Sequence, residues 1–192
     1  ISSHAQINDA ALSNCWVVNS LSVYLIKTAQ PLISFDIIIL QLKSYKKTLA
    51  IIPARYASTR FPGKPLAKIS GKTMIQHVWE NAKKTKGLDE ILIATDDERI
   101  LNAVNKFGGK VVLTNPDHKT GTDRIIEVLS GHSCEWVLNI QGDEPLISPY
   151  DLDKLIKKAQ ETKGVNAATL VQKFYNESSI KDPNIVKVVL DK

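Results

Sequence analysis

From Thr48 onward, short apolar runs typical of strands alternate with segments of helical period, and this alternation is the strongest constraint on the fold. The runs are 49–52, 90–95, 110–113 and 136–140, and the helical patterns are 74–82, 100–107, 125–129 and 148–159. Such alternation is typical of right-handed βαβ units, with a mostly parallel sheet and helices on both faces. We therefore predict a three-layer α/β/α fold, extended by two further strands at 167–171 and 185–190.

Residues 1–46 do not share this pattern. Their apolar runs, 15–26 and 33–42, are interrupted by polar side chains, and neither gives the roughly 18 uninterrupted apolar residues that a membrane helix needs. We expect 1–46 to be a disordered or non-native extension; a membrane-surface or partner-binding arm is the alternative. Residues 47–192 then form one domain, which suits a chain of 192 residues.

The two ends of the chain resemble the edges of a fragment. The first residue is Ile1, the sole methionine is Met74, and residues 188–192 continue a strand pattern to the last position. We therefore expect a fragment or a faulty gene model.

The formal net charge of +5 suits an anionic ligand, which could be a nucleotide or a nucleic acid. The lysine clusters at 83–86 and 154–158 fall on polar helix faces without interleaved aromatic residues, so we expect no nucleic acid partner. Cys15 and Cys134 lie far apart and form no metal or redox motif, which favours reduced thiols in a cytoplasmic protein.

The loop 53–65, which comes after the first strand, has the composition of a phosphate-binding loop. It contains Arg55, Arg60 and Lys64, two hydroxyl side chains and a glycine. Guanidinium and ammonium groups at the carboxyl end of a buried strand favour a polyphosphate ligand. The segment Ser70–Thr73 resembles the end of a P-loop, but position 66 holds leucine where that motif needs glycine.

A second candidate site comes after the fourth strand, in the segment 139–145. Asp143 lies at the carboxyl end of that strand beside Gly142, which allows a ligand to approach. Magnesium binds one or two carboxylates together with phosphate oxygens, so Asp143 is the predicted Mg²⁺ ligand.

Two further segments are weaker candidates. In 118–124, Thr122 could cap the next helix, while Gly121 and the neighbouring hydroxyl groups could face a base. Asp96 and Asp97 come after the second strand, where helix capping is the favoured role.

Taken together and in this order, these segments resemble the 3-deoxy-manno-octulosonate (Kdo) cytidylyltransferases. The resemblance runs from about Lys47 to Lys192 and is carried by 52–66, 94–96, 118–124, 139–145 and 186–191. It implies a Rossmann-like fold of the nucleotide-diphospho-sugar transferase type. It also implies transfer of CMP from CTP to Kdo with Mg²⁺, for lipopolysaccharide synthesis, by a homodimer that does not bind membranes.

The resemblance also implies roles for individual residues. Lys64 and Arg55 are the expected catalytic residues, and Asp143 is the expected metal ligand. The expected nucleotide-binding residues are Pro53, Ala54, Arg55, Ser58, Arg60, Lys64, Thr120, Arg124 and Gln141. Of these, Arg55, Ser58, Arg60 and Lys64 are expected on the triphosphate, while Pro53, Ala54, Thr120 and Arg124 are expected to frame the cytosine.

Two departures from the family pattern leave alternatives open. Asp123 stands where the family more often has glutamate, and the segments that hold the acidic sugar lie beyond Lys192. The sugar could therefore be 8-amino-Kdo or a sialic acid, or the chain could be an inactive CTP-binding remnant.

Overall fold

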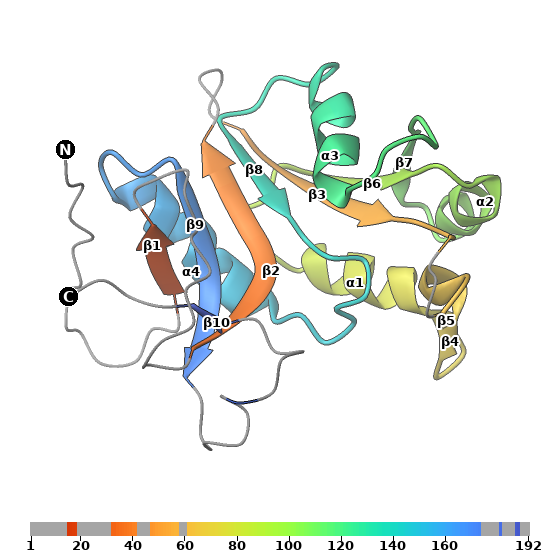
Figure 1. Ribbon diagram of the computed structural model, residues 1–192, viewed down its shortest axis with the longest axis horizontal. Coiled ribbons are helices and arrows are strands. Elements are labelled where there is room, and N and C mark those ends of the chain that lie inside the picture. Colours follow the sequence, from red (N-terminus) through yellow and green to blue (C-terminus); the bar gives the residue numbers. More distant parts are fainter. Residues whose placement is uncertain are drawn as a thin grey trace.

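An eight-stranded sheet forms the centre of the computed structural model, which describes residues 15–18, 32–41, 47–57, 61–173, 181 and 187–188 (Figure 1). Seven strands lie side by side in the order β1-β9-β2-β8-β3-β6-β7, and β10 also pairs with β2. The strands are β1 (Cys15–Val18), β2 (Leu32–Gln41), β3 (Thr48–Ala54), β6 (Glu90–Thr95), β7 (Lys110–Leu113), β8 (Trp136–Asn139), β9 (Ala167–Lys173) and β10 (Lys187–Val188).

The four strands β8, β3, β6 and β7 are parallel, as the alternating pattern predicts. Ile51 pairs with Leu92 of β6 on one side and with Asn139 of β8 on the other. Every residue of β3 is buried, which explains why the strand is apolar from Leu49 to Ala54 and does not alternate with polar residues.

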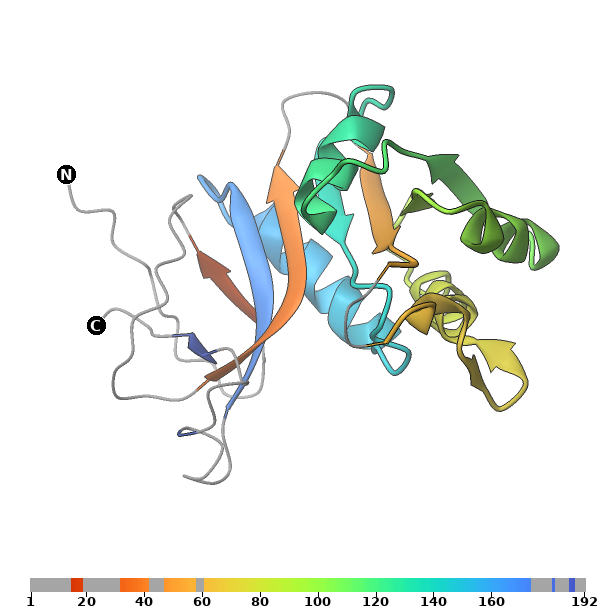
Figure 2. The same ribbon diagram turned by 45° about the vertical axis from the view of Figure 1, so that its right-hand side comes forward.

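The remaining strands are antiparallel to their neighbours, and β2 lies between β8 and β9 (Figures 1 and 2). The structure therefore places strands at Cys15–Val18 and Leu32–Gln41, inside the segment 1–46 that the sequence predicted to be disordered or non-native. Ile39 is fully buried, so β2 adds to the core at this position. The predicted strand 185–190 is described only at Lys187–Val188.

In the part of the chain that the structure describes, four α-helices cover the sheet, and the predicted α/β/α architecture is confirmed. They are α1 (Met74–Ala82), α2 (Glu98–Lys106), α3 (Gly121–Leu129) and α4 (Pro149–Glu161). Asp97, Thr120 and Ser148 are the side-chain N-caps of α2, α3 and α4, because each accepts a hydrogen bond from a backbone N–H of the first turn.

The core has two parts, one on each face of the sheet, because side chains alternate along each strand. On β3, Ala50 and Ile52 face the part built with α1, α2 and α4. Leu49 and Ile51 face the smaller part, which is built with α3. In the described part of the chain, no helix combines the length and the apolar character needed to cross a membrane.

Small elements connect β3 to α1: the 3-10 helix η1 (Lys64–Leu66) and the hairpin of β4 (Lys68–Ile69) and β5 (Lys72–Thr73). Ser70 and Gly71 form the hairpin turn with φ angles of 49° and 86°. Two successive residues with positive φ are typical of a tight hairpin turn. The segment Ser70–Thr73 is thus a hairpin and not a phosphate loop, as the missing glycine indicated.

Candidate nucleotide site at the carboxyl ends of the parallel strands

Three loops meet at the carboxyl end of β3, around the buried residue Pro53. A Cβ atom at Gly142 would lie 2.8 Å from the carbonyl oxygen of Pro53, and one at Gly121 would lie 3.4 Å from its Cγ atom. The chain therefore needs glycine at position 142 so that the loop after β8 can contact the end of β3. This contact brings the segments around Gly121 and Gly142 next to the first loop, as predicted for the ligand edge of a parallel sheet.

Two cationic side chains of the first loop, those of Lys64 and Arg55, contact the two neighbouring loops. The Lys64 ammonium group forms an ion pair with the Asp143 carboxylate after β8. The Arg55 guanidinium group donates from Nη1 to the carbonyl oxygen of Lys119, at 2.9 Å, in the loop between β7 and α3. Lys64, a predicted triphosphate-binding residue, thus lies against Asp143, the predicted metal ligand, and their side chains remain about one-third and one-half exposed.

The base of the first loop is closed by contacts that the sequence did not indicate. The Gly63 N–H donates to the carbonyl oxygen of Tyr56 at 2.8 Å. Gly63 has a φ of 72°, and a Cβ atom there would approach the Tyr56 ring to 3.0 Å. On α2, the Arg99 guanidinium carbon lies 3.3 Å from the centre of the same ring. Tyr56 therefore connects both ends of the loop to α2.

The predicted cap at Thr122 is wrong, because Thr120 is the N-cap of α3. The Asp123 N–H donates to Thr120 Oγ1 at 3.1 Å, and the Thr120 N–H donates to Asp123 Oδ2 at 3.0 Å. This reciprocal pair is a capping box, and it satisfies two backbone donors at the helix start. The hydrogen bonds from Thr120 hold the pKa of the Asp123 carboxyl below its ordinary value.

Arg124, which was expected to frame the cytosine, is fully buried beneath this edge of the sheet. Its guanidinium group forms an ion pair with Asp96 at 2.8 Å and donates to the hydroxyl of Thr114. Arg124 therefore connects α3 to the loops after β6 and β7. Asp97 is the N-cap of α2, as the sequence favoured, whereas Asp96 has this separate role in the ion pair.

Of the other predicted binding residues, the structure describes Ala54 and Gln141 but not Ser58 and Arg60. Ala54 is buried at the end of β3, and Gln141 lies just after β8 in a half-buried position. The backbone carbonyl of Gln141 accepts a hydrogen bond from the Glu144 N–H at 3.3 Å, which shapes the turn before α4. Ser58 and Arg60 lie outside the described residues.

Asp143, the Mg²⁺ ligand expected from the sequence, lies in this site with its carboxylate about half exposed. The Lys64 ammonium group already occupies a cation position on this carboxylate. Among the described residues, no group of three or more His, Cys, Asp or Glu side chains could hold a metal. Magnesium at Asp143 would therefore need phosphate oxygens or water as its other ligands, and this is its usual coordination beside a nucleotide.

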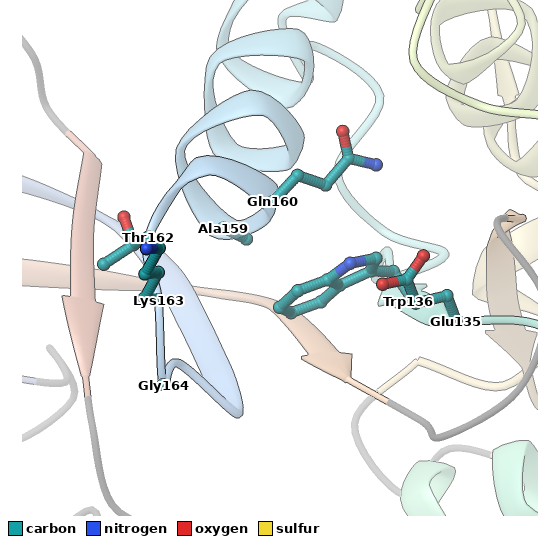
Figure 3. A pocket seen from close by; sticks show the side chains of 7 residues that line it. All are labelled: Glu135, Trp136, Ala159, Gln160, Thr162, Lys163 and Gly164. Atoms are coloured by element: carbon teal, nitrogen blue, oxygen red, sulfur yellow. The ribbon is translucent and has the colours of Figure 1, made fainter.

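A cavity of about 450 Å³ lies elsewhere, at the opposite end of β8 (Figure 3). Trp136, the first residue of β8, lines it together with Gln160 from α4 and Lys163 from the turn after that helix. Gln160 donates to the Thr48 hydroxyl at 3.1 Å, at the amino end of β3. Because Asp143 lies beyond the carboxyl end of β8, this cavity is separate from the candidate site.

Comparison with known proteins identifies relatives with similar sequences and folds. The chain is 50% identical to a 3-deoxy-manno-octulosonate cytidylyltransferase of Geobacter sulfurreducens, over 74% of this chain and 57% of that protein. It is 51% identical to an 8-amino-3,8-dideoxy-manno-octulosonate cytidylyltransferase of Shewanella halifaxensis, over 73% of this chain and 59% of that protein.

A solved structure of a CMP:2-keto-3-deoxy-manno-octonic acid synthetase complexed with CTP is also similar. Its TM-score is 0.60 at 47% sequence identity, covering 60% of this chain and 48% of that one. A cytidylyltransferase from Leptospira borgpetersenii shares the fold with a TM-score of 0.57 at 19% identity, over 66% of this chain and 60% of that one.

The chain spans less than two thirds of the length of these relatives. The family model described as Cytidylyltransferase nevertheless matches residues 49–192, which include β3 from Leu49 onward, the helices α1 to α4 and each loop of the candidate site. The chain therefore belongs to the cytidylyltransferase family.

Proposed function

We propose that this chain is the nucleotide-binding part of a 3-deoxy-manno-octulosonate cytidylyltransferase. The proposed enzyme transfers CMP from CTP to Kdo and releases pyrophosphate. The observation that carries the proposal is the contact between Lys64, from the loop after β3, and Asp143, from the loop after β8. One nucleotide with one divalent cation could reach both side chains and Arg55. The similarity to the Geobacter protein and to the synthetase complexed with CTP supports CTP as the nucleotide and a manno-octulosonate as the class of sugar.

The chemistry depends on the charge that develops during transfer. A hydroxyl of the sugar attacks the α-phosphorus of CTP in line with the departing pyrophosphate, so negative charge grows on the phosphate oxygens. In this proposal the Lys64 ammonium and the Arg55 guanidinium bind these oxygens, and the hydrogen bond from Arg55 to the Lys119 carbonyl orients the guanidinium group. Magnesium, when bound at Asp143, supplies further neutralisation of the phosphate charge.

A second candidate differs only in the sugar. Relatives at 50–51% identity from Shewanella halifaxensis and Shewanella frigidimarina act on 8-amino-3,8-dideoxy-manno-octulosonate, according to their names. Their identity to this chain equals that of the Kdo relatives, so the matched residues support both sugars equally. Turnover of the two sugars should therefore be compared in one protein, a version of this chain that continues to the full length of its relatives (the extended protein).

The remaining parts of the proposal are consequences of this reaction. The product would serve lipopolysaccharide assembly, which places the enzyme in the cytoplasm, where CTP is available. We expect a homodimer at the full length of the relatives. Neither a nucleic acid nor a membrane is needed by this reaction.

Calorimetric titration tests nucleotide binding by the chain itself. We expect CTP to bind in the presence of Mg²⁺, and ATP and UTP to bind much more weakly. Equal affinity for all three nucleotides would contradict a cytidine site. Binding of CTP without any turnover in the extended protein would favour the inactive remnant.

Substitution of Lys64 tests the catalytic assignment. Lys64→Ala removes a cation from the phosphate site, so we expect pyrophosphate release in the extended protein to fall by about 10²–10³, as for the loss of one preorganised charge contact. Lys110→Ala is the matched control. Lys110 forms an exposed ion pair with Glu90, and both residues lie at the amino ends of their strands, β7 and β6, on the side of the sheet away from the candidate site. An unchanged rate in Lys64→Ala would remove this lysine from the mechanism.

A further inference from the structure

The Glu127 carboxylate of α3 binds two residues of the loop between β7 and α3. Glu127, in the second turn of α3, accepts the Asn115 N–H at 2.9 Å and pairs with His118 Nε2 at 2.5 Å, both through Oε2. Inside the loop, Asn115 Oδ1 accepts the Asp117 N–H at 2.9 Å. These hydrogen bonds hold the pKa of Glu127 below its ordinary value, the bond from Asn115 being the largest cause and that from His118 the next.

Lys119 lies between two fixed residues of this loop. On its amino side, His118 is bound to Glu127, and on its carboxyl side, Thr120 is held by the capping box of α3. With both neighbours held, the backbone of Lys119 has little freedom to move. Its carbonyl oxygen accepts the hydrogen bond from Arg55 Nη1.

The Arg55 guanidinium group depends strongly on this carbonyl. Its Nε atom is buried and has no hydrogen-bond partner within the described residues, so the bond to Lys119 is the contact that fixes its orientation there. A shift of the loop would therefore change the direction of the guanidinium group, although the hydrogen bonds described for Glu127 go to Asn115 and His118 and not to Arg55. A misplacement of about 1 Å in a positioned group can cost about 10²-fold in rate, even when the substituted residue lies far from the chemistry.

We propose that Glu127 and His118 are positioning residues, which hold the Lys119 carbonyl and through it aim Arg55 at the nucleotide phosphates. This inference rests on the proposed function for its ligand, CTP. It also assigns a role to His118 and Glu127, which lie outside the set of binding residues expected from the sequence.

CTP affinity in the presence of Mg²⁺ is the first readout. We expect His118→Ala and Glu127→Ala to weaken CTP binding about tenfold or more, the effect of one poorly made hydrogen bond to a charged group. His118→Gln should restore most of the affinity, because its amide nitrogen can still donate to Glu127. Glu90→Ala breaks an exposed ion pair at the amino end of β6 and should leave the affinity unchanged.

Nuclear magnetic resonance of the unliganded chain gives a second readout that does not need CTP. We expect Glu127→Ala to speed hydrogen exchange at the Asn115 amide and to broaden or shift the Arg55 side-chain signals. Thermal unfolding shows whether each variant is folded. His118→Ala replaces Glu127→Ala if the latter does not fold.

The two readouts separate failure of this inference from failure of the proposed function. If the unsubstituted chain does not bind CTP, the proposed function fails, and the Arg55 signals still decide whether Glu127 orients that side chain. If CTP binds but the Asn115 amide loses protection without any change in affinity, the positioning role is overturned. Unchanged Arg55 signals in a folded Glu127→Ala variant would overturn it equally.

Discussion

The parallel and the antiparallel parts of the sheet differ in the loops that leave their strands. Loops after the parallel strands β3, β7 and β8 carry Arg55, Lys64, Thr120 and Asp143. In the described residues, no predicted site residue lies in or directly after the antiparallel strands β1, β2, β9 and β10. Because parallel strands all end at the same edge, their loops meet there, whereas antiparallel neighbours send successive loops to opposite edges.

The largest effect is expected for the buried ion pair that supports the loops of the parallel part. Arg124→Met leaves Asp96 and the Thr114 hydroxyl without the guanidinium group, so we expect the free energy of unfolding to fall by about 3–5 kcal/mol. Urea denaturation measures this change. Lys110→Met, which removes an exposed ion pair with Glu90 at the amino ends of β7 and β6, should change the free energy of unfolding little. Equal small losses for both variants would show that Arg124 does not hold these loops together.

The next prediction compares how much a buried residue of the antiparallel part and one of the parallel part contribute to the free energy of unfolding. Ile39 of β2 and Ile52 of β3 are both fully buried in the same part of the core. Replacing either with alanine should therefore lower the free energy of unfolding by a similar amount, about 2–5 kcal/mol. If Ile52→Ala destabilises the protein and Ile39→Ala does not, β2 is not an internal strand in solution, and the comparison between the two parts must be withdrawn.

The smallest effect is expected on the pH dependence of stability. It involves two carboxylates of α3, the helix that packs on the parallel strands. The pKa values of Asp123 and Glu127 are lowered in the folded chain, Asp123 chiefly by Thr120 and Glu127 chiefly by the Asn115 N–H. Groups with a lowered pKa stabilise the fold above their unfolded pKa, and that contribution is lost as the pH falls through the folded value. Unfolding measured between about pH 6 and pH 3 should show this loss.

A variant isolates the contribution of Glu127 to this acid response. Glu127→Gln should make the stability less sensitive to acid, because the position no longer titrates. Glu161→Gln, at an exposed position near the end of α4, should leave the sensitivity unchanged. An identical pH dependence in all three proteins would show that Glu127 does not contribute.

The sequence predicted most of the parallel part because each of its elements has a local signal. The apolar runs located β3, β6 and β7 closely, and Ser148 before Pro149 marked the start of α4 correctly. Lys64 and Asp143 were each predicted to follow a parallel strand, and parallel strands end at one edge of the sheet, which is why these residues lie together although 79 positions separate them.

The features that were missed depend on contacts between distant segments. Arg124 and Asp96 are 28 positions apart, and no local pattern indicates that a buried guanidinium group will join them. In β2, the polar Asp36 interrupted the apolar run, and the register shifts between Ser34 and Ile38, around this position. A bulge of this kind breaks the alternation from which a strand is read.

The ion pair between Lys64 and Asp143 has a consequence for how the site discriminates between anions. In the unliganded site the charge of the Lys64 ammonium is largely neutralised by the Asp143 carboxylate. A polyanion without a metal ion is therefore attracted by the ammonium group and at the same time repelled by the carboxylate. A nucleotide carrying its own divalent cation supplies a partner for each of the two side chains at once. We therefore expect the site to select the metal-chelated triphosphate over free triphosphate, and inorganic phosphate to compete poorly with either.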